Sequence, residues 1–126
     1  MQDRYLSRAK RIDNGRWVYG LPSYDKDGEF REIEAYEDTD VVFYAVDPST
    51  ICQCTAMPDK NKKLVFEHDI VWDSDERAFY EIIWNQEHMC WNVEDADGHK
   101  SEFEECYGST IEVNGNRFDN PELLEV

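Results

Sequence analysis

The second half of this chain has very few basic residues. Residues 64–126 contain 3 Lys and Arg against 17 Asp and Glu, whereas residues 1–63 contain 10 against 12, and the net charge is −16. Nucleic-acid binding depends on clustered Lys and Arg that neutralise phosphates, so this composition argues against direct contact with DNA or RNA. The simplest interpretation of the acidity is solubility and repulsion of wrong partners.

Long apolar runs are also missing. No run approaches the roughly 20 residues that a membrane-spanning helix needs, and the first ten residues lack the apolar core of a signal peptide. We therefore expect a cytoplasmic protein without a membrane partner. Its four cysteines are then expected to be reduced thiols.

The soft side chains do not have the spacing of a structural zinc site. They are Cys52, Cys54, His88, Cys90 and Cys106. Zinc knuckles usually take C-x2-4-C, because a single intervening residue on a strand does not let two sulfurs wrap the metal. We expect packed free thiols and no metal.

Two Asp-Gly loops, at residues 25–28 and 95–98, resemble the middle of a calcium loop. The first ligand position would fall on Ser23 or Val93, and neither loop has flanking helices. Ordinary turns between strands explain both loops better.

Catalytic patterns are weak as well. His68 stands between Glu67 and Asp69, which suggests an acid/base cluster, but no Ser or Cys nucleophile lies in a recognised motif. A histidine of this kind is more often a solvated turn residue. The six glycines are scattered singly, so no phosphate-binding loop is present. We predict a protein that is not an enzyme and has no cofactor.

What the chain does have is β sequence. Seventeen aromatic residues and several alternating runs favour strands in one domain, residues 1–126. We predict strands at 16–21, 29–34, 41–46, 50–57, 78–84, 88–93 and 110–118. The run at 41–46 is almost wholly apolar and is expected to be buried on both faces.

Helical signals are few. Ser101 and Glu104 have the spacing of a capping box, which predicts a short helix near 102–107. Pro121 is placed like the first residue of a second short helix.

Residues 55–71 form the most informative segment. A polar turn leads into the apolar run 64–66, and a second acidic turn precedes 70–72. This segment resembles the YopX family of phage and prophage proteins. The matching residues are Thr55, Asp59, Lys60, Asn61, Lys63, Glu67, Asp69, Ile70 and Val71, and similarity extends to residues 10–20, 46–51 and 112–124.

The chain departs from the family pattern where Ala56, Lys62 and His68 replace glycines, and Cys52 replaces another apparent one. If the turn at His68 keeps a positive φ, exchanging it for glycine should leave stability unchanged or raise it by about 0.5–1 kcal/mol.

The resemblance implies an SH3-like small barrel with additional strands, and an oligomer, but no activity. Three hypotheses follow. The first is a non-enzymatic, self-associating protein-interaction module of phage type that acts in a bacterial host cell, with a host protein as a candidate partner. The second is an acidic DNA mimic that inhibits a host nucleic-acid-binding protein. The third is a metal-binding or enzymatic accessory protein.

Overall fold

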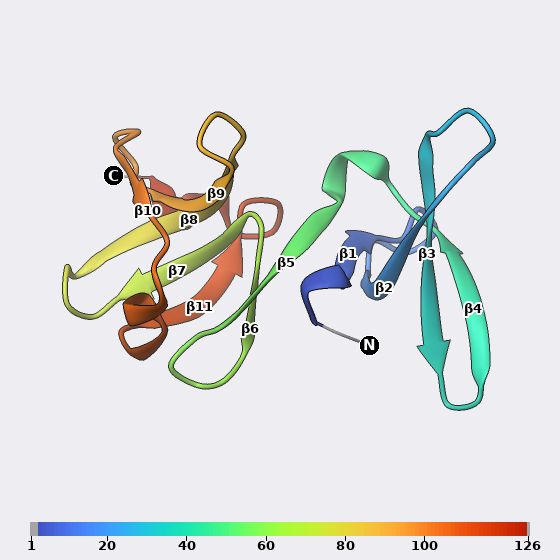
Figure 1. The fold of residues 1–126 in the computed structure, drawn as a ribbon, viewed down its shortest axis with the longest axis horizontal. Coiled ribbons are helices and arrows are strands. Elements are labelled where there is room, and N and C mark those ends of the chain that lie inside the picture. The colour runs from blue at the N-terminus through green and yellow to red at the C-terminus, as the bar shows by residue number, and fades with distance from the viewer. Residues whose placement is uncertain (1–2, 126) are drawn as a thin grey trace. The chain divides into compact units, whose positions relative to one another are not determined.

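The computed structural model describes residues 3–125, and that part is mainly β, as the sequence predicts (Figure 1). The chain divides into two compact units, Met1–Cys54 (unit 1) and Thr55–Val126 (unit 2). Both are built from antiparallel strands and short 3-10 helices. Among the described residues, no helix is long and apolar enough to cross a membrane.

Unit 1 is a single antiparallel sheet with strand order β4-β3-β2-β1-β5. Its elements are η1 (Asp3–Tyr5), β1 (Ser7–Lys10), β2 (Trp17–Tyr24), β3 (Phe30–Glu37), β4 (Asp40–Ala45), η2 (Pro48–Thr50) and the first residues of β5 (Cys52–Pro58). The fully buried cluster is small and consists of Ala9, Ile33 and Val46. Partly buried side chains such as Val18, Phe30 and Tyr44 pack against it.

Strand β4 is where the burial prediction was wrong. It lies at the edge of the sheet and pairs with β3 through a two-residue turn (Figure 1). Val41 and Phe43 are 47% and 53% exposed, whereas the sequence predicted burial on both faces. The sequence of an apolar run does not show whether its strand lies at the centre or at the edge of a sheet, because strand order is set by pairing between distant segments.

Unit 2 holds the larger core. Its elements are β6 (Leu64–Phe66), β7 (Asp69–Asp73), β8 (Ala78–Asn85), β9 (Cys90–Glu94), β10 (Lys100–Glu102), η3 (Glu105–Ser109), β11 (Ile111–Asn116) and η4 (Pro121–Leu124). Five of its strands are ordered β10-β9-β8-β7-β11. Side chains with no exposed surface fill the centre: Val65, Val71, Ile82, Val93 and Ile111.

Strand β5 runs through the division between the units. Its first residues pair with β1, where Ser7 lies opposite Gln53, and its second part neighbours β6. In the described part of the chain neither sheet closes on itself. The coarse prediction of a mainly β fold is therefore confirmed, but a closed barrel is not formed.

Most predicted strands are present with shifted ends, but the predicted capping box was wrong. Ser101 lies in β10 opposite Val93, and the helix begins later, at η3. Glu104 precedes η3 without a side-chain capping bond. The spacing of Ser101 and Glu104 favours a helix only weakly, and the pairing of this segment with β9 outweighs it. Pro121 does begin a short helix, η4, as predicted.

Candidate functional site

The first turn of the family-like segment is organised by a buried carboxylate. Asp59 is 3% exposed. Its Oδ1 accepts hydrogen bonds from the backbone N–H groups of Asn61 (2.8 Å) and Lys63 (2.9 Å). Its Oδ2 accepts one from Val113 of β11 at 3.0 Å. Because both oxygens are used by backbone donors, Asp59 ties the β5–β6 turn to β11 and has little capacity for a ligand.

Other residues of this segment also make internal contacts. The Nζ of Lys60 lies 3.7 Å from Glu112 on β11, and Asp69 Oδ2 accepts the Phe66 N–H at 2.8 Å. Ile70 and Val71 have no exposed surface. The segment thus supplies turns, a cross-strand ion pair and core residues to unit 2.

Three positions share a backbone conformation that favours glycine. Ala56, Lys62 and His68 have φ of +65°, +66° and +68°. These are the positions where the resembling family has glycine. All three turns thus place a non-glycine residue in left-handed backbone, and each position carries some strain.

His68 belongs to a charged cluster that differs from the predicted one. Its Nδ1 lies 2.7 Å from Glu81 Oε2, and its Nε2 lies 3.8 Å from Glu67. Arg117 reaches the same Glu81 oxygen at 3.3 Å. The side chain of His68 is only 23% exposed, and its ring meets Phe118 edge to face. The expectation of a solvated histidine was therefore wrong.

The sequence interpretation did not identify Glu81 as a site residue, although the sequence contains a signal for it. It is the only charged residue in the apolar run 78–84, and a lone acid in such a strand must find partners when buried. Here it is 8% exposed and joins the β6–β7 turn to the segment after β11. Asp69, the predicted neighbour, serves the turn backbone instead.

Both Asp-Gly loops are turns, as predicted. Asp25 and Asp95 each accept two backbone N–H groups with one carboxylate oxygen, and Gly28 and Gly98 have positive φ. The N–H of Glu29 is the main reason why the pKa of Asp25 lies below its usual range. The N–H of His99 has the same effect on the pKa of Asp95.

One loop brings potential metal ligands together. Within the described residues, a ligand atom from each of Asp95, Asp97 and His99 lies within 4.8 Å of the others. Glu104, on which the twelfth position of a calcium loop would fall, is not part of this group. All three side chains belong to one surface turn, and backbone N–H groups of that turn already donate hydrogen bonds to the Asp95 carboxylate.

The thiols are separated between the units. Cys52 and Cys54 are buried in unit 1, as expected of packed thiols, and Cys52 donates to the carbonyl of Thr50. Cys90 is partly exposed and lines a hollow of about 270 Å³ in unit 2, together with His88 and Asn92. The side chain of Cys106 lies outside the described residues.

A second kind of candidate site is the edge of unit 1. We define the β4 edge surface as Tyr36, Val41 and Phe43, which are all about half exposed. Tyr36 lies opposite Val41, and Glu34 lies opposite Phe43, so these side chains share one face of the hairpin. A hydrogen bond to Glu34 raises the pKa of Tyr36. Such an apolar edge has the chemistry of an interaction surface.

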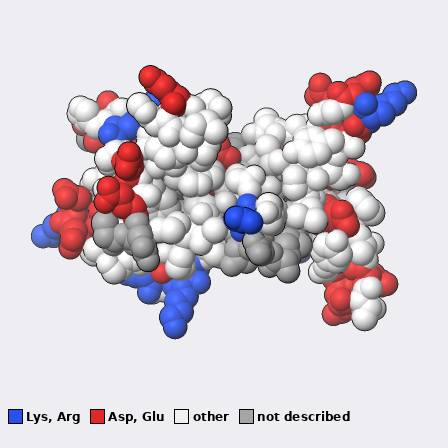
Figure 2. All heavy atoms as spheres, in the orientation of Figure 1, with Lys and Arg blue, Asp and Glu red and all other residues white. Residues whose placement is uncertain are grey.

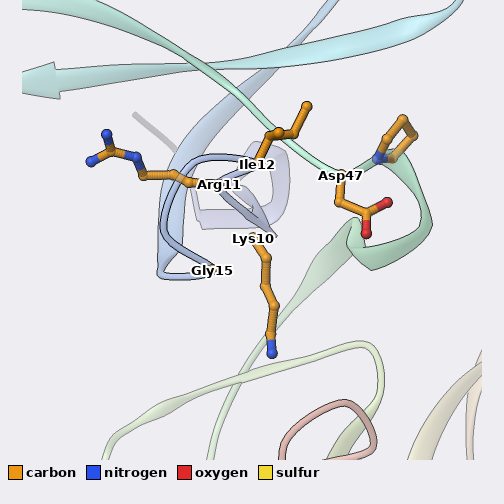
Figure 3. Close-up of a pocket in the computed structure, with 6 residues that line it drawn as sticks. Lys10, Arg11, Ile12, Gly15 and Asp47 are labelled. Carbon is orange, nitrogen blue, oxygen red and sulfur yellow. The ribbon is translucent and has the colours of Figure 1, made fainter.

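Two hollows lie near the end of β4. One, of about 270 Å³, is lined by Arg11, Ile12, Phe43 and Tyr44 among others. The other, of about 380 Å³, is lined by Arg11, Ile12 and Asp47 among others, and in Figure 3 the Arg11 side chain extends away from Asp47. Arg11 stacks on the Tyr44 ring at 4.4 Å. It also binds Asp13 through two hydrogen bonds, which raise the pKa of Arg11 and lower that of Asp13.

Comparison with known protein families gives a match over nearly the whole chain. The sequence model of the family described as YopX protein matches residues 8–125, which is nearly the whole chain. No curated protein matches the chain.

Proposed function

Because the chain belongs to the YopX family, we propose that it is a non-enzymatic phage or prophage protein that self-associates and acts through protein contacts. The observation that carries this proposal is the β4 edge surface. Edge strands with exposed apolar side chains favour pairing with another chain, and charged or bulged edges normally prevent it. β4 has Val41 and Phe43 at its centre and acids only at its tip.

The acidic side chains described above support a structural role for unit 2. Asp59 and Asp69 accept backbone N–H groups, and Glu81 is bound by His68 and Arg117. These internal contacts favour a structural role for the three acids over a role in turnover. The SH3-like architecture belongs to the proposal for unit 2 alone, and five antiparallel strands around one core support it.

Sedimentation equilibrium tests self-association. We expect a concentration-dependent mass well above the 14.9 kDa chain. The double variant Val41→Lys/Phe43→Lys should sediment as a monomer, since two charges at the strand centre prevent edge pairing. Met89→Lys is the matched control, because Met89 is also an exposed apolar residue but belongs to unit 2. A wild-type protein that stays monomeric at every concentration contradicts the proposal.

DNA mimicry is a second candidate, and only charge favours it. Unit 2 has 18 Asp and Glu against 6 Lys and Arg. Figure 2 shows acidic side chains in separate groups on the face it presents, with uncharged surface between them. A mimic needs carboxylates at regular phosphate-like spacing, so we rank this function below self-association. Competition with DNA for a host nuclease or repressor would test it.

A further inference from the structure

The free edge of β4 offers a defined set of backbone groups. Glu37 and Asp40 flank the two-residue turn, and in such a hairpin the flanking pair is the hydrogen-bonded one. Pairs then alternate, so Tyr36–Val41 and Glu34–Phe43 are non-hydrogen-bonded pairs. The N–H and C=O groups of Val41 and Phe43 therefore point away from β3.

Ala45 supports this assignment. It lies two residues beyond Phe43 and so faces the same way. Its carbonyl accepts the N–H of Ile12 at 3.1 Å, from outside the β3–β4 hairpin. The outward carbonyl at the end of β4 is thus already used, and the outward groups of Val41 and Phe43 lie at the centre of the edge.

We propose that β4 pairs antiparallel with β4 of a second copy, about a two-fold axis at Val42, so that one sheet continues through both copies. This inference rests on the proposed self-association and specifies its interface. A two-fold interface is isologous, so residue i meets residue j and j meets i. Val41 of each copy then lies opposite Phe43 of the other, and both residues have outward backbone groups.

Neighbouring registers are worse. An axis at Phe43 pairs Val41 with Ala45, whose carbonyl is occupied by Ile12. An axis at Val41 pairs Phe43 with Thr39, which lies in the turn. The axis at Val42 alone joins four outward-facing residues from the two copies, and it places the apolar Val41 and Phe43 side chains side by side.

Charge favours the same arrangement. Each hairpin tip carries the exposed acids Glu37, Asp38 and Asp40. With the axis at Val42, the two Asp40 residues lie four residues apart along the paired strands, roughly 14 Å, which still exceeds the screening length of about 8–10 Å. It also puts Asp40 of the second copy opposite Tyr44, on whose ring the Arg11 guanidinium lies. The acidic tip of one copy thus comes near Arg11 of the other, a side chain that Asp13 of its own copy also binds.

Site-specific cross-linking tests the register. In a non-hydrogen-bonded antiparallel pair the Cα atoms are about 4.5 Å apart, which is within the range of a disulfide. We expect Val42→Cys to form a 42–42 disulfide after oxidation with diamide, identified by mass spectrometry of non-reduced peptides. Val41→Cys and Phe43→Cys should cross-link poorly alone, and an equimolar mixture of the two should link residue 41 to residue 43.

A charge variant provides a second test that does not need a new thiol. Asp40→Lys should raise the dissociation constant of the dimer roughly tenfold, since it removes attraction to Arg11 and adds repulsion. Asp27→Lys makes the same charge change on the exposed β2–β3 loop, so it should change the constant by no more than about twofold.

The outcomes separate the two proposals. A monomeric wild-type protein overturns self-association itself. If the wild type associates but the disulfide forms at 41 or 43 alone, or Asp40→Lys associates as tightly as Asp27→Lys, the interface is wrong and self-association stands. If Val42→Cys does not fold, as judged by circular dichroism, the comparison of Asp40→Lys with Asp27→Lys still decides.

Discussion

The two units of this chain differ in how completely they bury their apolar side chains. Unit 2 surrounds five fully buried aliphatic residues with aromatic rings, whereas the fully buried cluster of unit 1 has three members, one of them alanine. Among the described residues, seven large apolar side chains are exposed in unit 1 and two in unit 2. The comparison shows that unit 2 buries its apolar side chains more fully than unit 1, whose exposed edge is the surface that we propose for self-association.

Charge follows the same division. Unit 1 has 7 Lys and Arg against 11 Asp and Glu, so its net charge is −4, while that of unit 2 is −12. Like charge opposes association, because repulsion between copies increases with the product of their charges. The less charged unit is thus the one that exposes the apolar edge, which is what a self-associating protein needs.

The largest expected effect is in the core of unit 2. Ile82→Ala should lower the free energy of unfolding by about 2–5 kcal/mol, because it leaves a cavity at a fully buried site. Urea unfolding, followed by tryptophan fluorescence at fixed protein concentration, measures this. Val41→Ala, at the exposed edge of unit 1, is the control and should change the monomer stability by less than about 1 kcal/mol. Equal losses would contradict the difference between the units.

The turn carboxylates should show the next largest difference. Asp59→Ala leaves three backbone N–H groups without their buried acceptor, and we expect a loss of about 2–3 kcal/mol. Asp25→Ala removes an equivalent acceptor from an exposed turn of unit 1, where water replaces it. If Asp25→Ala proves as damaging as Asp59→Ala, burial is not what makes the unit 2 turn important.

His68→Gly should destabilise the protein by about 1 kcal/mol. Relief of the positive φ contributes roughly 1 kcal/mol, but the lost hydrogen bond to buried, charged Glu81 costs about 1.5–3 kcal/mol. The contacts thus reverse the sign expected from the backbone alone. Urea unfolding would show no loss if the imidazole contributes nothing.

Lys62→Gly is the companion experiment with a smaller effect of opposite sign. Lys62 has nearly the same φ as His68, but its side chain is exposed. We expect a gain of about 0.5–1 kcal/mol in the same urea assay, since strain is relieved without loss of contacts. A loss at Lys62 would mean that chain entropy outweighs strain in these turns.

The smallest effect concerns acid. The pKa values of Asp25 and Asp95 are lowered, mainly by backbone N–H donors, so each carboxylate stabilises the fold above its ordinary pKa of about 3.9. This stability is lost as the pH falls below about 4 and through the lowered pKa. Asp25→Asn and Asp95→Asn should therefore lose less stability than the wild type between pH 6 and pH 3. Urea midpoints at the two pH values check this, and an equal loss would contradict it.

The sequence predicted what is locally encoded. Asp-Gly turns, alternating runs and a proline at a helix start act over a few residues, and the structure contains them. It did not predict that β4 is an edge strand or that Glu81 binds His68, because both depend on which distant strands become neighbours. At Ser101 a local signal was misleading, because its spacing from Glu104 predicted a helix start but the residue pairs with β9.

Strand β5 has a practical consequence for dissecting this protein into fragments. Its first residues complete the sheet of unit 1 beside β1, and its remaining residues neighbour β6 in unit 2. A cut between Cys54 and Thr55 would divide β5, so that each fragment would carry an incomplete strand at the cut. Overlapping fragments, 1–58 and 52–126, would give each half its own copy of β5 and are the better starting point for expressing the halves separately.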